Sequence, residues 1–132
     1  MNVYLCGAIF GKRDDECVVW RRMAREALEA AGHHAIDPMD RDYRGREDSE
    51  HVRIVLDDIA DIRASDALLV MARTPSWGTA MEVREGFALG KVVVSVVDEG
   101  RVSPWLRYHS HRLCYTLSGA IDAIVHWNAH LR

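Results

Sequence analysis

The chain has 132 residues, of which 48% are hydrophobic and 28% are charged, and its net charge is -3. This length fits one compact domain, so we expect residues 1–132 to form a single unit. Basic and acidic residues are interleaved, which argues against a nucleic-acid polymer as partner. No run reaches the roughly 18 apolar residues that a membrane span needs, and the first residues lack the basic lead-in of a secretion signal. We therefore expect a soluble cytoplasmic protein with no membrane partner.

The first half of the chain predicts two strands, each followed by a helix. Residues 2–7 form an apolar run that predicts a strand, and a helical pattern follows over about residues 16–31, with Asp14 and Asp15 as N-terminal caps. Residues 33–37 predict a second strand, and residues 38–49 are polar and rich in turn formers. From Glu50 onward, apolar residues recur at helical spacing, so this face is expected to pack inward. It comprises Val52, Val55, Leu56, Ile59 and Ile62.

The second half predicts three more strands and two helices. The strands are expected at residues 67–72, 91–97 and 112–116, and the helices at 79–90 and 118–131, the last with Ser118 near its cap. Strands that are apolar throughout and separated by helices are typical of a parallel sheet covered on both faces. We therefore predict an α/β fold, a doubly wound five-stranded parallel sheet.

Several kinds of site are not supported by the sequence. Neither the glycine-rich dinucleotide motif nor the P-loop is present, so no nucleotide cofactor is expected. The cysteines Cys6, Cys17 and Cys114 form an odd set without repeated spacing, which predicts reduced thiols. Two histidine pairs, 109/111 and 126/130, lack an obvious third ligand, so we expect no metal.

The most informative carboxylate is Glu82, which follows a glycine turn in the opening turns of the helix predicted over residues 79–90. In an open parallel sheet, ligands bind beyond the carboxyl ends of the strands, where such helices begin. The positive end of a helix favours the ionised form that a nucleophile requires. The alternative is that Glu82 only complements the helix dipole.

Four segments together resemble the nucleoside 2-deoxyribosyltransferase family and the related 2'-deoxynucleoside 5'-phosphate N-hydrolases. They are VYLCGAIFG, PMDRDYRG, DDIADIRASDALLV and PSWGTAMEVREGFALGKVVV. The resemblance implies a flavodoxin-like fold, usually oligomeric, in which a glutamate at the start of a helix attacks the anomeric carbon of the sugar. Glu82 matches that glutamate, Tyr4 the tyrosine that orients it, and Asp58 the aspartate that contacts the base and assists its protonation.

Several residues differ from the family pattern, so the sequence does not decide between a nucleoside and a nucleotide substrate. Ser76 replaces an aspartate that the transferases tend to carry, and the hydrolases have a phosphate-binding serine there. Against a phosphate, Ala8 and Phe10 stand where the hydrolases place a serine and an arginine. Ser103 lies close to a serine that the hydrolases supply from a neighbouring subunit. Asp42 stands where some transferases carry a glutamine, and a carboxylate there would accept from amino groups of the base.

The sequence therefore predicts an enzyme that breaks the N-glycosidic bond of a deoxynucleoside and transfers the sugar to another base. The alternatives are a nucleotide N-hydrolase and a binding module that has lost turnover. The partner is a deoxynucleoside or deoxynucleotide, and the pocket of a homo-oligomer is expected to be completed by the segment 101–109 of a neighbouring subunit. The predicted substrate-binding residues are Gly7, Phe10, Asp40, Asp42, Ser76, Trp77, Gly78 and Ser103.

Overall fold

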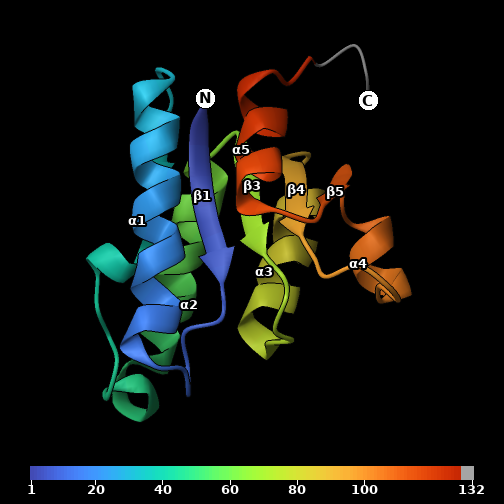
Figure 1. Ribbon diagram of the computed structural model, residues 1–132. Coiled ribbons are helices and arrows are strands. Elements are labelled where there is room, and N and C mark those ends of the chain that lie inside the picture. Colours follow the sequence, from blue (N-terminus) through green and yellow to red (C-terminus); the bar gives the residue numbers. More distant parts are fainter. Residues whose placement is uncertain (129–132) are drawn as a thin grey trace.

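The computed structural model describes residues 1–128, which form one five-stranded sheet with all neighbouring strands parallel. The order across the sheet is β2-β1-β3-β4-β5, and Figure 1 shows β1, β3, β4 and β5 in this order. The strands are β1 (Asn2–Gly7), β2 (His34–Ile36), β3 (Ala67–Met71), β4 (Val92–Val96) and β5 (Arg112–Cys114). The predicted α/β fold is confirmed, and the chain crosses from one half of the sheet to the other between β2 and β3.

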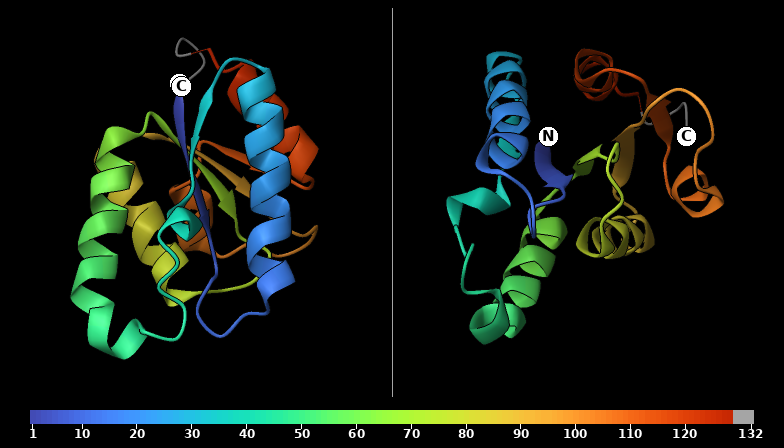
Figure 2. Two further views of the ribbon diagram at one scale, coloured as in Figure 1. Left: turned by 90° about the vertical axis from the view of Figure 1, so that its left-hand side faces the viewer. Right: turned by 60° about the horizontal axis from the view of Figure 1, so that its bottom comes forward.

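Helices cover both faces of this sheet. They are α1 (Asp14–Ala30), α2 (Glu47–Ala64), α3 (Trp77–Ala88), α4 (Pro104–Tyr108) and α5 (Leu117–Val125), with a short 3-10 helix η1 (Pro38–Asp40) after β2. The right-hand view of Figure 2 shows α1 and α5 on one face and α2 and α3 on the other. No helix within residues 1–128 is long and apolar enough to cross a membrane.

Alternation along β1 decides which side chains reach each layer. Val3 and Leu5 pack into the cluster that contains residues of α1 and α5, whereas Tyr4 and Cys6 pack into the cluster beneath α2 and α3. Successive side chains of a strand point to opposite faces, which gives this division. Tyr4 therefore lies on the α3 side of the sheet, and no part of its surface is exposed.

The prediction for α2 was wrong about which face is buried. Of its residues only Ile62 is buried, whereas Val52 is 59% exposed and Leu56 is 61% exposed. Val55 is also more than half exposed. Helical periodicity shows that one side of a helix is apolar, but it does not show what covers that side. In the single chain most of this side of α2 faces solvent.

Several element boundaries also differ from the predictions. Helix α1 begins at Asp14 with Arg13 as N-cap, so Asp14 and Asp15 lie in its first turn, and α2 begins at Glu47. The hydroxyl of Thr116 caps α5 by accepting from the amide of Gly119 at 3.0 Å, which corrects the expected role of Ser118. Helix α5 ends at Val125, and the last expected helical residues, 129–131, lie outside the described residues. Helix α4 was not predicted.

Candidate active site

Tyr4 and Glu82 meet at the boundary between β1 and α3. The Tyr4 hydroxyl donates a hydrogen bond to the Glu82 carboxylate. Tyr4 is fully buried, whereas Glu82 keeps part of its surface accessible. Gly78 belongs to the same helical face, and a Cβ atom there would lie 4.0 Å from Oε1 of Glu82. Strand β1 therefore fixes the position of this carboxylate, and the small residue one turn earlier leaves space above it.

Asp58 on α2 interacts electrostatically with Glu82 and Tyr4. It is half-buried, and its negative charge raises the pKa of Glu82 and of Tyr4. Three residues that are far apart in the sequence, from β1, α2 and α3, are thus brought together. The family resemblance had named these three residues together.

The ionisation of Glu82 differs from the expectation. Burial, together with the charge of Asp58, raises the pKa of Glu82 to about 8, although the Tyr4 hydrogen bond and the Arg21 cation lower it. The electrostatic effect of a helix N-terminus falls off within the first turn. Glu82 is the sixth residue of α3 and its carboxylate faces the buried Tyr4. Removal from water therefore outweighs the helix dipole.

Burial also raises the pKa of Asp58, to about 6, against the lowering effect of Arg41. The two carboxyls interact, so together they hold one proton between about pH 6 and pH 8. Because Glu82 has the higher pKa of the two, this proton lies mainly on Glu82, and the pair supplies an ionised Glu82 and a proton donor when the proton moves to Asp58. The sequence analysis named both residues but did not anticipate that they share a proton.

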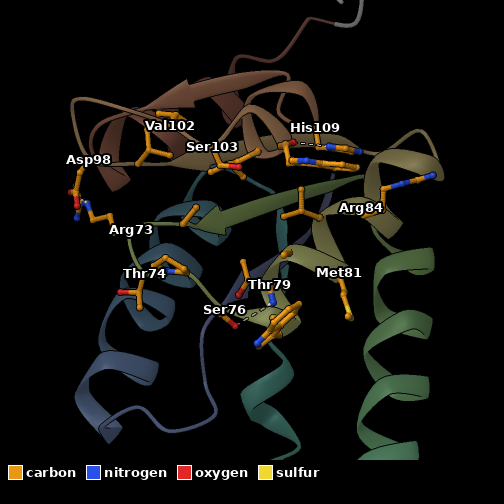
Figure 3. A pocket seen from close by; sticks show the side chains of 18 of the residues that line it. Arg73, Thr74, Ser76, Thr79, Met81, Arg84, Asp98, Val102, Ser103 and His109 are labelled. Atoms are coloured by element: carbon orange, nitrogen blue, oxygen red, sulfur yellow. Dashed lines mark hydrogen bonds and ion pairs between the residues drawn. The ribbon is translucent and has the colours of Figure 1, made fainter.

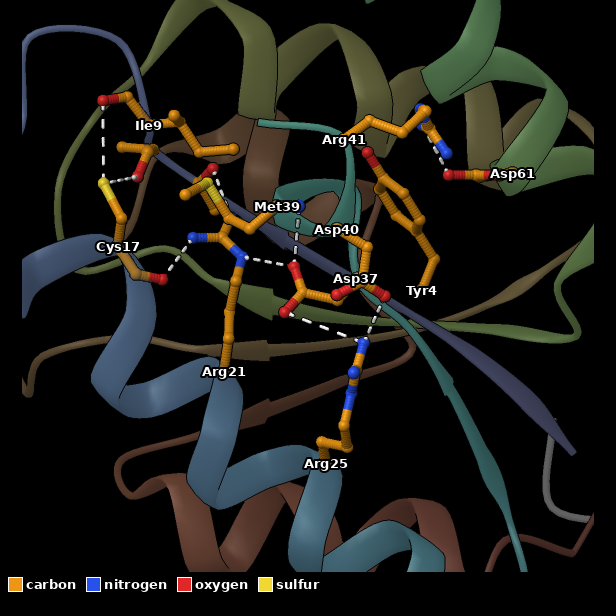
Figure 4. Close-up of polar contacts among 12 residues, drawn as sticks. Tyr4, Ile9, Cys17, Arg21, Arg25, Asp37, Met39, Asp40, Arg41 and Asp61 are labelled. Atoms are coloured by element: carbon orange, nitrogen blue, oxygen red, sulfur yellow. Dashed lines mark hydrogen bonds and ion pairs between the residues drawn. The ribbon is translucent and has the colours of Figure 1, made fainter. Parts of the chain in front are cut away.

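Arg21 was missed by the sequence analysis. Its side chain is 1% exposed, and its two terminal nitrogens donate to the carbonyls of Cys17 at 2.8 Å and Gly7 at 2.9 Å. Its Nε lies 3.6 Å from a carboxylate oxygen of Asp37, as Figure 4 shows. This cation anchors the end of β1 and offsets part of the negative charge near Glu82. A single arginine in an amphipathic helix gives no sequence signal of such burial.

The predicted residues of the first two loops do not contact Glu82 through any hydrogen bond or ion pair found in residues 1–128. Phe10 is 78% exposed. Asp40 pairs with Arg25 at 2.6 Å, and both oxygens of Asp42 accept from Arg44. Gly7 ends β1, where its carbonyl accepts from Arg21. Oδ1 of Asp42 accepts from both the amide and Nε of Arg44, whereas Oδ2 accepts from Nη2 alone and so keeps a lone pair for a further donor.

Ser76, Trp77 and Ser103 line a separate cavity of about 860 Å³ between α3 and the segment that follows β4. Figure 3 shows this cavity with Ser76 and Thr79 on one wall and Ser103 on the other. Its lining does not include Tyr4, Asp58 or Glu82. Trp77 is 85% exposed at its rim. The predicted site residues therefore lie in two places. Tyr4, Asp58 and Glu82 lie on one side of α3. A largely apolar cavity, lined by Ser76, Trp77 and Ser103, lies on the other side.

The family model described as nucleoside 2-deoxyribosyltransferase matches residues 3–123. That range includes β2 to β5, all of β1 except Asn2, and every predicted site residue. The chain therefore belongs to the nucleoside 2-deoxyribosyltransferase family.

Two kinds of individual relative are similar to it. A mouse protein named 5-hydroxymethyl-dUMP N-hydrolase is 28% identical over 109 residues, which cover 76% of this chain and 61% of that protein. The chain thus spans less than two thirds of the length of this relative. A solved structure of the 2-deoxyribosyltransferase from Bacillus psychrosaccharolyticus superposes with a TM-score of 0.76 at 15% identity, covering 98% of this chain and 94% of that one.

Two further solved structures share the fold. The 2-deoxyribosyltransferase of Leishmania mexicana has a TM-score of 0.60 at 25% identity, covering 83% of this chain and 71% of that one. The CMP N-glycosidase of Clostridium botulinum has a TM-score of 0.62 at 14% identity, covering 94% and 98%. The same arrangement of strands and helices thus occurs in proteins named for sugar transfer and in one named for glycosidic cleavage.

The shared proton makes a pH dependence testable. We expect kcat/KM for a deoxynucleoside to follow a bell-shaped curve with limbs near pH 6 and pH 8. Below the lower limb both carboxyls are protonated, so neither can act as a nucleophile. Above the upper limb both are ionised, so neither can donate a proton. Initial rates measured across this range check the curve, and a rate that is flat from pH 5 to pH 9 would contradict the shared proton.

Proposed function

We propose that the chain cleaves the N-glycosidic bond of a deoxynucleoside and transfers the deoxyribosyl group to another nucleobase, with Glu82 as the nucleophile. The observation that carries this proposal is the contact of Glu82 with the Tyr4 hydroxyl, with the charge of Asp58 beside it. A positioned carboxylate and a nearby acid are the two groups that a retaining glycosidase needs. Membership of the family supports the same reaction class.

The proposed reaction has two steps. An oxygen of ionised Glu82 forms an ester bond to the anomeric carbon while the bond from that carbon to the base nitrogen breaks. The electron pair of this bond goes to the base, which takes the proton of Asp58. In the second step a nitrogen of another base attacks the anomeric carbon and gives its proton to Asp58. The ester breaks and Glu82 becomes a carboxylate again.

Replacing Glu82 tests this mechanism. Glu82→Gln keeps the size of the side chain but cannot form the ester, so we expect activity to fall by at least about three orders of magnitude. The matched control is Glu85→Gln on the same helix, which should retain activity. The assay incubates protein with a deoxynucleoside and a second free base and follows both the new deoxynucleoside and free deoxyribose. Equal activity of the Glu82→Gln variant and the wild type would end the proposal.

A nucleotide N-hydrolase is the second candidate, and the cavity beside α3 favours it. Ser76, which caps α3, and Ser103 line the same cavity within one chain. Thr79 also lines the cavity and is 6% exposed, and its hydroxyl is buried without a hydrogen-bond partner. Arg101 also lines the cavity. Hydroxyls, a cation and a helix N-terminus are groups that hold a phosphate, and the mouse relative is named for an N-hydrolase of a nucleotide.

Comparing a deoxynucleoside with its 5'-monophosphate separates the two candidates. If the cavity binds the phosphate, the monophosphate should have the higher kcat/KM, and Arg101→Met should reduce this preference by about tenfold because a charge-assisted contact is lost. Arg22→Met on α1, on the opposite face of the sheet, is the matched control. Equal rates with and without the phosphate would reject the nucleotide reading and leave transfer between nucleosides.

We also propose that a second copy of the chain covers the face formed by α2 and α3. Val52, Val55 and Leu56 on α2 and Met81 on α3 are each more than half exposed. Exposed apolar groups gathered on one face are typical of an interface. Asp58 and Glu82 belong to the same two helices, so a copy bound there would also cover the site. The segment 101–109 remains the proposed donor to the neighbouring pocket.

Light scattering in solution tests the association. We expect the wild type to have at least twice the mass of one chain and Leu56→Glu to be smaller, because burying an unpaired charge in an apolar interface is costly. Met23→Glu is the matched control, since Met23 is 56% exposed on α1, on the opposite face of the sheet. A monomeric wild type, or dissociation caused only by Met23→Glu, would contradict this interface.

A further inference from the structure

Arg41 contacts three carboxylates of α2. It lies directly after η1, and its Nη2 is 2.7 Å from an oxygen of Asp61 and 3.4 Å from an oxygen of Asp58. Its Nε lies 3.5 Å from Asp57 and makes no hydrogen bond. Figure 4 shows Arg41 directed at Asp61. One cation is therefore divided among three anions.

The spacing of the three aspartates explains this arrangement. Asp58 and Asp61 are three residues apart on a helix, and Asp57 and Asp61 are four apart, so their side chains are neighbours on the surface of α2. The guanidinium approaches Asp61 more closely than Asp58. Because the Coulomb energy falls with distance, Asp61 takes the larger share of the positive charge. Asp58 is left only partly compensated.

We propose that Arg41 and Asp61 act as a positioning pair for proton transfer, in which the division of the Arg41 charge determines how readily Asp58 donates its proton to the leaving base. This inference rests on the proposed function of Asp58. It adds two residues that act through Asp58 and do not themselves reach the substrate. A different distribution of the Arg41 contacts among the three aspartates would change the pH range over which Asp58 holds its proton.

The charges around Asp58 act in opposite directions. Arg41 favours the ionised form, whereas Asp57 and Asp61 on α2, Glu82 on α3, and the ionised forms of Tyr4 and Cys6 on β1 favour the protonated form. Burial also favours the protonated form and raises the pKa of Asp58 to about 6. Since Arg41 is the opposing cation in this group, removing it and removing Asp61 have opposite consequences.

Two single substitutions test the pair. Arg41→Met removes the cation, so the acidic limb of the kcat/KM profile should move upward by about 0.5 to 1 pH unit. Asp61→Asn removes a like charge and frees the guanidinium for Asp58, so the same limb should move downward by a similar amount. A purely structural role would lower the rate of both variants without moving their limbs in opposite directions. The profiles are compared with that of the wild type.

Matched controls lie on the same helix. Arg63→Met and Asp48→Asn each remove one exposed charge of α2, and both should leave the limb in place. Carbon-13 NMR titration of the Asp58 carboxyl in the free protein provides a second readout that needs no turnover, and Arg41→Gln, which also removes the charge, serves if Arg41→Met fails to fold. Opposite shifts in this titration support the pair even in a protein that proves inactive. Shifts in the same direction, or no shift in either variant, would overturn it.

Discussion

The contact between the Tyr4 hydroxyl and the Glu82 carboxylate is the interaction on which the proposed chemistry depends. Tyr4 is fully buried in the middle of the sheet, so its hydroxyl requires a partner inside the protein. Glu82 is that partner, and the contact fixes its carboxylate against β1. The same burial makes the ionised form of Glu82 less stable, so the placement that orients this carboxylate also raises its pKa to about 8.

Two arginines lower the pKa values of the two carboxyls, Arg21 that of Glu82 and Arg41 that of Asp58. Arg21 is held beneath the end of β1 by the carbonyls of Cys17 and Gly7, and its charge lowers the pKa of Glu82. Arg41 approaches from the loop after η1 and lowers the pKa of Asp58. Neither arginine contacts Glu82 through a hydrogen bond found in the described part of the chain. Both act through space, which is effective because the surroundings are poorly hydrated.

The sequence predicted the sheet well because each central strand is a continuous apolar run. Residues 67–72 and 91–97 are typical of strands buried on both faces, and the structure places β3 and β4 within them. The group of Tyr4, Asp58 and Glu82 came from the family resemblance, because β1, α2 and α3 are far apart in the sequence. No local pattern predicts that they meet.

Other features depend on three-dimensional context that a sequence does not contain. Arg21 follows Trp20 in an ordinary amphipathic helix, yet its side chain is almost completely buried. The apolar residues of α2 suggested an inward face, but Leu56 faces solvent. The ionisation of Glu82 was also misjudged, because its position in the helix was visible in the sequence and its burial against Tyr4 was not. In each case burial, not residue type, decided the outcome.

The exposed side of α2 bears on whether a base or water completes the reaction. Transfer requires that the sugar ester survive until a second base arrives, so water has to be kept from it. In the single chain Glu82 remains partly accessible and Leu56 is mostly exposed, so solvent reaches the helices that carry both carboxyls. A second copy bound on this face would bury the apolar residues and exclude water at the same time. If the proposed second copy binds this face, assembly and the choice between transfer and hydrolysis are physically linked.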